Sequence, residues 1–174
     1  FNISAFLESG HIADLAKLYC EKIDKFNLDY DVIFGPAYKG IPLAAAVATV
    51  LNEKVSKQIP ICFDRKEEKD HGEGGALVGS VKNKRVLIID DVLTVGTALK
   101  NSINLIQEAG GTISAVIIAL DRQEQVEGKQ VSKKLSNELD VPILSISSLE
   151  SLINFLETSS QKDIAERLKS SIER

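Results

Sequence analysis

Long apolar runs and helical apolar repeats alternate along the chain. The runs VLIID (86–90) and ISAVIIAL (113–120) are continuous and rich in β-branched residues. This pattern is typical of strands that are buried on both faces of a parallel sheet. Shorter apolar runs bounded by turn residues predict further strands at 31–35, 59–63 and 142–147.

Between these runs, apolar residues recur at helical spacing, and the segment 41–51 is apolar nearly all round, which suggests a buried helix. The predicted helices cover residues 10–26, 41–51, 96–109 and 148–157, with a last helix that includes Ile164, Leu168 and Ile172. Ser147 and Glu150 are spaced to form a capping box at the start of the fourth helix. Strands that alternate with helices predict a single α/β domain over residues 1–174. Its central sheet is expected to be mainly parallel, with helices on both faces.

Composition and charge narrow the classes of protein to which this chain can belong. The net charge of −4 argues against a nucleic-acid surface, and no apolar run approaches the 18 residues of a membrane span. No secretory signal opens the chain, and Cys20 and Cys62 form no CxxC motif. We therefore expect a cytoplasmic protein with reduced thiols that binds neither nucleic acid nor membrane. Because the chain begins at Phe1 and contains no Met, an N-terminal segment is expected to be missing.

Two adjacent aspartates end the buried run 86–90. In parallel α/β sheets ligands bind beyond the carboxyl ends of the strands, so Asp90 and Asp91 are expected at a ligand site. Gly96, in the turn TVGTA (94–98), allows the backbone to approach a ligand closely. The N–H groups of this turn and of the following helix suit a phosphate, and the carboxylates suit sugar hydroxyls or a hydrated divalent cation. The stretch therefore predicts a site for a ribose 5-phosphate.

The segment RVLIIDDVLTVGTAL (85–99) resembles the signature motif of the phosphoribosyltransferases that use phosphoribosyl pyrophosphate (PRPP). The resemblance implies the type I phosphoribosyltransferase fold, which adds a small hood region to the sheet. It implies that Asp90 and Asp91 contact the ribose hydroxyls and hold Mg²⁺ largely through water and substrate. The substrate-binding residues that follow are Val92, Thr94, Val95, Gly96, Thr97 and Ala98. Val95 stands where the family more often has a small residue.

A second glycine turn, FGPAYKGIP (34–42), also lies between a predicted strand and a predicted helix. Lys39 can reach a polyanion there, although Tyr38 and Lys39 also fit an ordinary surface turn. In the family this loop binds pyrophosphate and often contains a cis peptide bond, which here would join Ala37 and Tyr38. The resemblance therefore implies that Tyr38 and Lys39 bind substrate.

The stretch RKEEKDHGEGG (65–75) combines cations, a histidine and glycines without an apolar anchor. Such a run is often only a solvated loop, but it also suits a lid that closes over pyrophosphate and excludes water. It resembles the catalytic loop of the orotate phosphoribosyltransferases, as do GPAYKGIPLA (35–44) and LDRQE (120–124). By this resemblance substrate is bound by Arg65, Lys66, Lys69 and His71, and the catalytic residues are Lys69, His71 and Asp91.

The same resemblance implies the reaction and the acceptor. PRPP and orotate would give orotidine 5′-monophosphate and pyrophosphate, with Mg²⁺ as cofactor, in the synthesis of UMP. Arg122, which alone would be an ordinary surface arginine, would bind the carboxylate of orotate, as suits a planar guanidinium. Phe1 would end the segment that packs on the orotate ring. The family also implies a homodimer in which each active site borrows the 65–75 loop of the neighbouring subunit.

Two other interpretations are open at this point. A purine or uracil phosphoribosyltransferase would share the segment 85–99 but not the stretches 65–75 and 120–124. A non-catalytic regulator that senses PRPP would need a DNA-binding helical domain or a basic face, and the sequence shows neither.

Overall fold

Helices and strands alternate through the computed structural model, which describes residues 2–54, 58–65, 75–159 and 161–172. The helices are α1 (Ile3–Glu8), α2 (Ile12–Lys25), α3 (Gly40–Lys54), α4 (Thr97–Glu108), α5 (Val131–Leu139), α6 (Leu149–Thr158) and α7 (Lys162–Ile172). The strands are β1 (Val32–Phe34), β2 (Ile61–Asp64), β3 (Leu77–Val78), β4 (Arg85–Leu93), β5 (Thr112–Asp121), β6 (Gln125–Val126), β7 (Lys129–Gln130) and β8 (Ile143–Ser148).

The central sheet has the strand order β3-β2-β1-β4-β5-β8. Its neighbouring strands are parallel, except that β3 runs antiparallel to β2. The longest strands, β4 and β5, lie side by side in the middle, and residues 86–89 of β4 are fully buried. This confirms the mainly parallel sheet that the continuous apolar runs predict.

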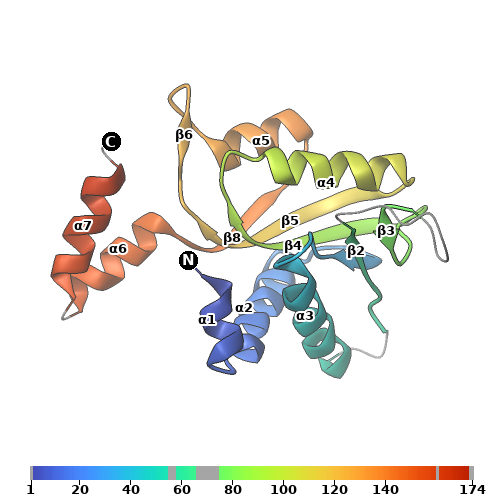
Figure 1. Cartoon of the computed structure of the whole chain (residues 1–174), viewed down its shortest axis with the longest axis horizontal. Helices are drawn as coiled ribbons and strands as arrows, with labels where there is room; N and C mark the ends of the chain where they lie inside the picture. Colours follow the sequence, from blue (N-terminus) through green and yellow to red (C-terminus); the bar gives the residue numbers. More distant parts are fainter. Residues whose placement is uncertain (1, 55–57, 66–74, 160, 173–174) are drawn as a thin grey trace.

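Helices cover both faces of the sheet, as the alternation of elements predicts. Figure 1 shows α2 and α3 on one face and α4 and α5 on the other. Two separate apolar cores result. The first contains Tyr19 of α2 and Leu87 of β4, and the second contains Ile103 of α4 and Ile88 of β4. Adjacent residues of β4 therefore face opposite layers, as a doubly covered strand requires.

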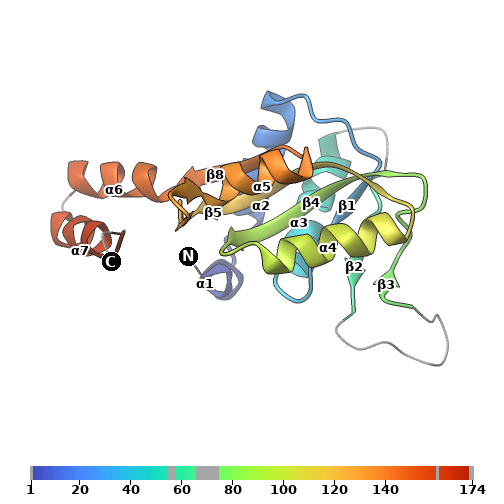
Figure 2. The same cartoon turned by 90° about the horizontal axis from the view of Figure 1, so that it is seen from above.

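The C-terminal helices α6 and α7 pack against each other beyond the carboxyl end of β8 (Figures 1 and 2). A small apolar cluster that includes Ile153, Leu156 and Ala165 joins them. Within the described part of the chain, each helix is too short or too polar to cross a lipid bilayer. The hood region that the family resemblance implies stays a prediction.

Several predicted boundaries are wrong. The hydroxyl of Ser148 accepts a hydrogen bond from the backbone N–H of Ser151 (3.2 Å), so the cap of α6 lies one residue after the predicted Ser147 and does not use Glu150. α2 ends at Lys25, so Phe26, the last residue of the predicted helix, follows it and is 48% exposed. The strand predicted to end at Asp90 continues to Leu93.

The sequence analysis missed short elements whose apolar signal is weak. These are α1, β3, α5 and the β6–β7 hairpin. The hairpin turns through Glu127 and Gly128, which both have positive φ angles. In α5, Val131 and Leu135 are buried at helical spacing, but polar residues separate them. Elements this short are fixed by their packing on the sheet more than by their own sequence.

The two cysteines are free thiols, as predicted. Cys20 and Cys62 are fully buried, one in each of the two apolar cores. Burial raises the pKa of both thiols to about 11. They therefore act as small apolar core residues.

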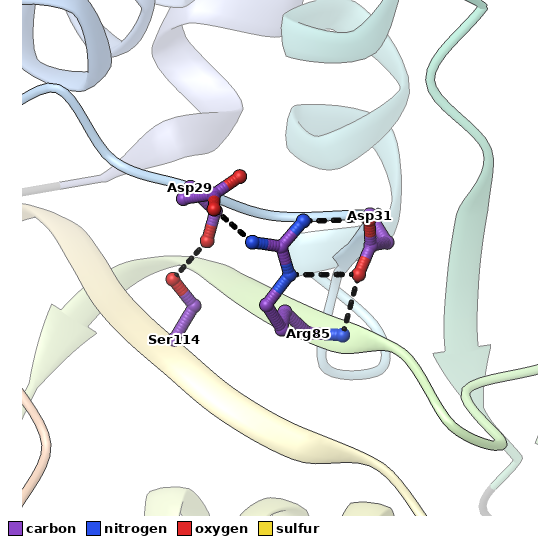
Figure 3. A network of polar contacts seen from close by, with 4 residues as sticks. All are labelled: Asp29, Asp31, Arg85 and Ser114. Atoms are coloured by element: carbon purple, nitrogen blue, oxygen red, sulfur yellow. Dashed lines mark hydrogen bonds and ion pairs between the residues drawn. The ribbon is translucent and has the colours of Figure 1, made fainter.

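Arg85 joins three segments at the amino end of the central strands (Figure 3). Its guanidinium bonds both carboxylate oxygens of Asp31, at 3.0 and 2.9 Å, and also bonds Asp29. Its own backbone N–H donates to Asp31 as well (3.0 Å). Ser114, the extra residue where the register of β5 shifts against β4, donates to the carbonyl of Asp29 (2.5 Å). The network thus ties the segment before β1 to the starts of β4 and β5.

Candidate active site

The predicted site residues meet at the carboxyl end of β4. A cavity of about 250 Å³ is lined by Lys39, Asp91, Val92, Thr94 and Arg122. These residues come from the start of α3, the end of β4 and the turn after β5. The strand order reverses its direction between β1 and β4, and open α/β sheets bind ligands at such a switch point.

Asp91 lines this cavity and Asp90 precedes Asp91 in β4, and both side chains are partly withdrawn from water. Asp91 is 8% exposed, and its Oδ2 lies 3.5 Å from the Nζ of Lys39. Burial raises the pKa of Asp90 to about 7, and the neighbouring charge of Asp91 adds to this shift. A pair of carboxylates held this close and this buried is stabilised by a cation or by hydrogen-bond donors from a ligand.

The donor set fits Mg²⁺ only together with substrate. Asp90 Oδ1 accepts the N–H of Asp91 (2.8 Å), and Asp91 Oδ1 accepts the N–H of Val92 (2.9 Å), while Asp91 Oδ2 faces Lys39. Within the described residues no group of three or more acidic, histidine or cysteine side chains is placed to hold a metal. Mg²⁺ usually takes one or two carboxylates plus water and substrate oxygens. Asp90 and Asp91 are therefore the residues that would hold it.

The turn after β4 presents backbone N–H groups at the start of α4. Gly96 has a φ of 85°, and a side chain there would collide with Leu135 of α5, so this position requires glycine. The first bond of the helix runs from the N–H of Lys100 to the carbonyl of Gly96 (3.0 Å). The earlier N–H groups, those of residues 97–99, precede that bond and can face an anion. Thr94, Val95, Thr97 and Ala98 are exposed here, as a phosphate site needs.

The second predicted loop is packed tightly against β4. The peptide bond between Ala37 and Tyr38 is cis, as the family resemblance implies. Gly40 lies so close to the carbonyl of Ile89 that an added Cβ would come within 3.1 Å of it. Tyr38 is exposed. This loop therefore places Lys39 beside Asp91, where both line the cavity.

Asp64, at the end of β2, is a residue of this site that the sequence analysis missed. Its Oδ1 accepts the N–H of Ala37 (2.6 Å), so it fixes the residue that begins the cis peptide. The sequence shows Asp64 only as a polar residue that ends an apolar run. Its role depends on a partner 27 residues away, which no local pattern reveals.

Arg122 reaches the cavity from the turn after β5. The carboxylate of Asp121 accepts bonds from the Ser132 hydroxyl (2.6 Å) and from the N–H of Gln123 (2.8 Å), which fixes this turn. The Arg122 side chain is half exposed and pairs with Glu124 at 3.1 Å. The ion pair with Glu124 thus helps to orient the guanidinium group of Arg122, and the side chain lines the same cavity as Lys39.

Other predicted residues lie outside this cavity or outside the described chain. Among the described residues, the predicted ones that do not line the cavity are Tyr38, Arg65, Asp90, Val95, Gly96, Thr97 and Ala98. The backbone N–H of Arg65 bonds the carbonyl of Ala76 (2.8 Å), and β2 pairs with β3, so this hairpin holds both ends of the predicted lid. Phe1, Lys66, Lys69 and His71 lie outside the described residues, and their roles stay predictions.

Comparison with known proteins identifies the family. Residues 4–147 match the phosphoribosyl transferase domain. The orotate phosphoribosyltransferase of Cellvibrio japonicus is 43% identical over 172 residues, which are 98% of this chain and 80% of that protein. The enzyme of the same name from Salmonella newport is 43% identical over 169 residues, 97% of this chain and 78% of that protein. The crystal structure of orotate phosphoribosyltransferase from Francisella tularensis superposes with a TM-score of 0.82 at 36% identity and covers 98% of this chain and 80% of that one. The chain belongs to the orotate phosphoribosyltransferase family.

Proposed function

We propose that this cavity transfers ribose 5-phosphate from PRPP to orotate, giving orotidine 5′-monophosphate and pyrophosphate in the synthesis of UMP. The observation that carries the proposal is the single cavity that combines Lys39, Asp91, Thr94 and Arg122 at the switch point of the sheet. A cation, a carboxylate and a phosphate-binding turn suit PRPP, and the arginine suits the carboxylate of orotate.

The reaction breaks the bond between the anomeric carbon and pyrophosphate and forms a bond to a ring nitrogen of orotate. Lys39 faces the side of the site where negative charge grows on the departing pyrophosphate, which stabilises the transition state. The turn 94–98 holds the remote 5-phosphate, and this binding energy aligns the ribose for attack. Asp91 accepts hydrogen bonds from the ribose hydroxyls. Bound Mg²⁺ would supply further positive charge to the pyrophosphate oxygens.

The first test is an acceptor panel. Orotate with PRPP and Mg²⁺ should be consumed, as followed by its loss of ultraviolet absorbance, while uracil, adenine and hypoxanthine should not react. Turnover of a purine or of uracil in place of orotate would favour the alternative phosphoribosyltransferases. Binding of PRPP without turnover of any base would favour a regulatory sensor.

Asp64→Ala should raise the KM for PRPP about tenfold. The substitution removes the acceptor of the Ala37 N–H and so loosens the loop that carries Lys39. Loss of one such hydrogen bond costs roughly 1–2 kcal/mol, which corresponds to about a tenfold effect. Asp64→Asn keeps an oxygen acceptor and should retain most of the affinity. An unchanged KM for PRPP in Asp64→Ala would show that the loop does not depend on this bond.

We further propose a cytoplasmic homodimer in which the 65–75 loop completes the site of the neighbouring subunit. The family resemblance supports this arrangement, and the loop has no apolar residue to anchor it on its own chain. Mixing inactive Lys69→Ala with inactive Asp91→Asn and allowing subunits to exchange should restore roughly a quarter of wild-type activity. About half the dimers are then mixed, and each mixed dimer has one site free of both substitutions. Verified exchange without recovery would show that the loop serves its own chain.

A further inference from the structure

β4 carries the two aspartates close to its carboxyl end. Leu87 and Ile89 of β4 pack in the core under α2 and α3. Regular alternation would put Leu93 on that same face, because side chains two residues apart point the same way. Leu93 instead packs in the core under α4. The pairing of β4 with β5 keeps one register from Leu87 to Leu93, so the strand continues through Asp90 and Asp91 and only its last residue packs on the other side of the sheet.

A buried tyrosine bonds the backbone of β4 at the two aspartates. The hydroxyl of Tyr19, in the middle of α2, donates to the backbone carbonyl of Asp90 (2.7 Å). Tyr19 is fully buried, and burial raises the pKa of its hydroxyl well above the usual range, so it stays a donor. On this side of the sheet the pairing of β1 with β4 ends at Phe34 and Ile88, so Asp90 lies beyond the last β1 partner.

The bond acts on the peptide group that links the two aspartates. The carbonyl of Asp90 and the N–H of Asp91 belong to one planar unit, so fixing the oxygen also fixes the N–H. That N–H donates to the carboxylate of Asp90, and the next N–H, of Val92, donates to the carboxylate of Asp91. Tyr19 thus directly holds the peptide group that orients the carboxylate of Asp90. The same peptide group leads into Asp91, whose carboxylate is bonded by the N–H of the next peptide group.

We propose that Tyr19 is a positioning residue, which aims Asp90 and Asp91 at PRPP by holding the peptide group between them. The proposal rests on the proposed function, because it assigns these carboxylates to PRPP. Tyr19 lies outside the cavity and acts through the backbone alone.

The test compares Tyr19→Phe with Tyr30→Phe. Both substitutions remove one phenolic hydroxyl, and both rings pack in the same core, but Tyr30 precedes β1 at the amino end of the sheet. Tyr19→Phe should raise the KM for PRPP about tenfold and weaken calorimetric PRPP binding in the presence of Mg²⁺ by a similar factor, while the KM for orotate stays unchanged. Tyr30→Phe should leave all three values at the wild-type level. Replacing the Tyr19 hydroxyl by an amine, through incorporation of 4-aminophenylalanine, restores a donor and should recover most of the affinity for PRPP.

Thermal unfolding of each variant separates positioning from folding, and the kinetic values are taken per mole of folded protein well below the melting temperature. A lower melting temperature with an unchanged KM for PRPP would overturn the proposal, because Tyr19 would then only stabilise the core. Equal increases in the KM values for PRPP and orotate would overturn it as well. If the wild-type protein binds PRPP but does not consume orotate, the proposed function fails, whereas the calorimetric comparison still decides the role of Tyr19.

Discussion

Asp91→Asn is expected to lower turnover by about a hundredfold or more and to leave the fold intact. The substitution removes the negative charge that faces Lys39 and that we propose binds the ribose hydroxyls, while the asparagine oxygen can still accept the N–H of Val92. Loss of one charged interaction that acts in the transition state costs roughly 3 kcal/mol, which corresponds to more than a hundredfold in rate. Steady-state kinetics with saturating PRPP and orotate measure the effect, and circular dichroism checks the fold.

Asp140→Asn is the matched control. It makes the same chemical change at the C-cap of α5, where φ is 52° and asparagine is well tolerated. This variant should turn over at the wild-type rate. A near-normal rate in Asp91→Asn would exclude Asp91 from the chemistry, because the substitution leaves the packing of β4 unchanged.

The second large effect is expected on the binding of orotate, the base that accepts the ribose 5-phosphate. Arg122→Ala should weaken the binding of orotate by roughly 2–4 kcal/mol, which is about 30- to 1000-fold in affinity, and should change the KM for PRPP much less. Arg122 lines the cavity, and its guanidinium can bind a carboxylate in a planar, two-pronged manner that an alanine cannot replace. Direct binding of orotate, measured by calorimetry in the presence of pyrophosphate, separates affinity from turnover.

Two further variants sharpen this experiment. Arg122→Lys keeps the charge but not the planar fork, so its affinity for orotate should lie between those of the wild type and Arg122→Ala. Arg85→Ala removes an arginine at the opposite end of β4 and should lower the melting temperature without changing the affinity for orotate. If Arg122→Ala binds orotate as the wild type does, the acceptor lies in another pocket.

The sequence predicted the parts of the fold whose apolar patterns are long. β4 and β5 form from continuous apolar runs, α2 and α4 from apolar repeats at helical spacing, and α3 from a segment that is apolar nearly all round. In these elements the residue pattern itself indicates which positions are buried. The segment from Gln123 to Val141 was not assigned any element, although it forms a hairpin and α5. Its apolar residues are few, and their burial depends on the sheet beneath them.

The same limit applies to the site. Asp91 and Thr94 lie at the carboxyl end of β4, where the rule for parallel sheets places ligands, and the family resemblance pointed to Arg122, so the sequence led to three of the residues that line the cavity. Tyr19 and Asp64 act through hydrogen bonds to distant backbone groups, 71 and 27 residues away. Tyr19 has the pattern of an ordinary core residue of a helix. Only the folded structure shows that its hydroxyl donates a hydrogen bond to the peptide group between the two aspartates.

The network of Arg85 with Asp29, Asp31 and Ser114 has a consequence for engineering. β4 carries this network at its first residue and Asp91 near its last, so the residues that fasten the strands and those that handle the ligand are separated along one strand. Most enzymes compromise heat tolerance when their catalytic groups are optimised, because the same region serves both needs. Here a substitution library restricted to the surroundings of Asp29 and Ser114 can tune heat tolerance while selection on the ligand end proceeds independently.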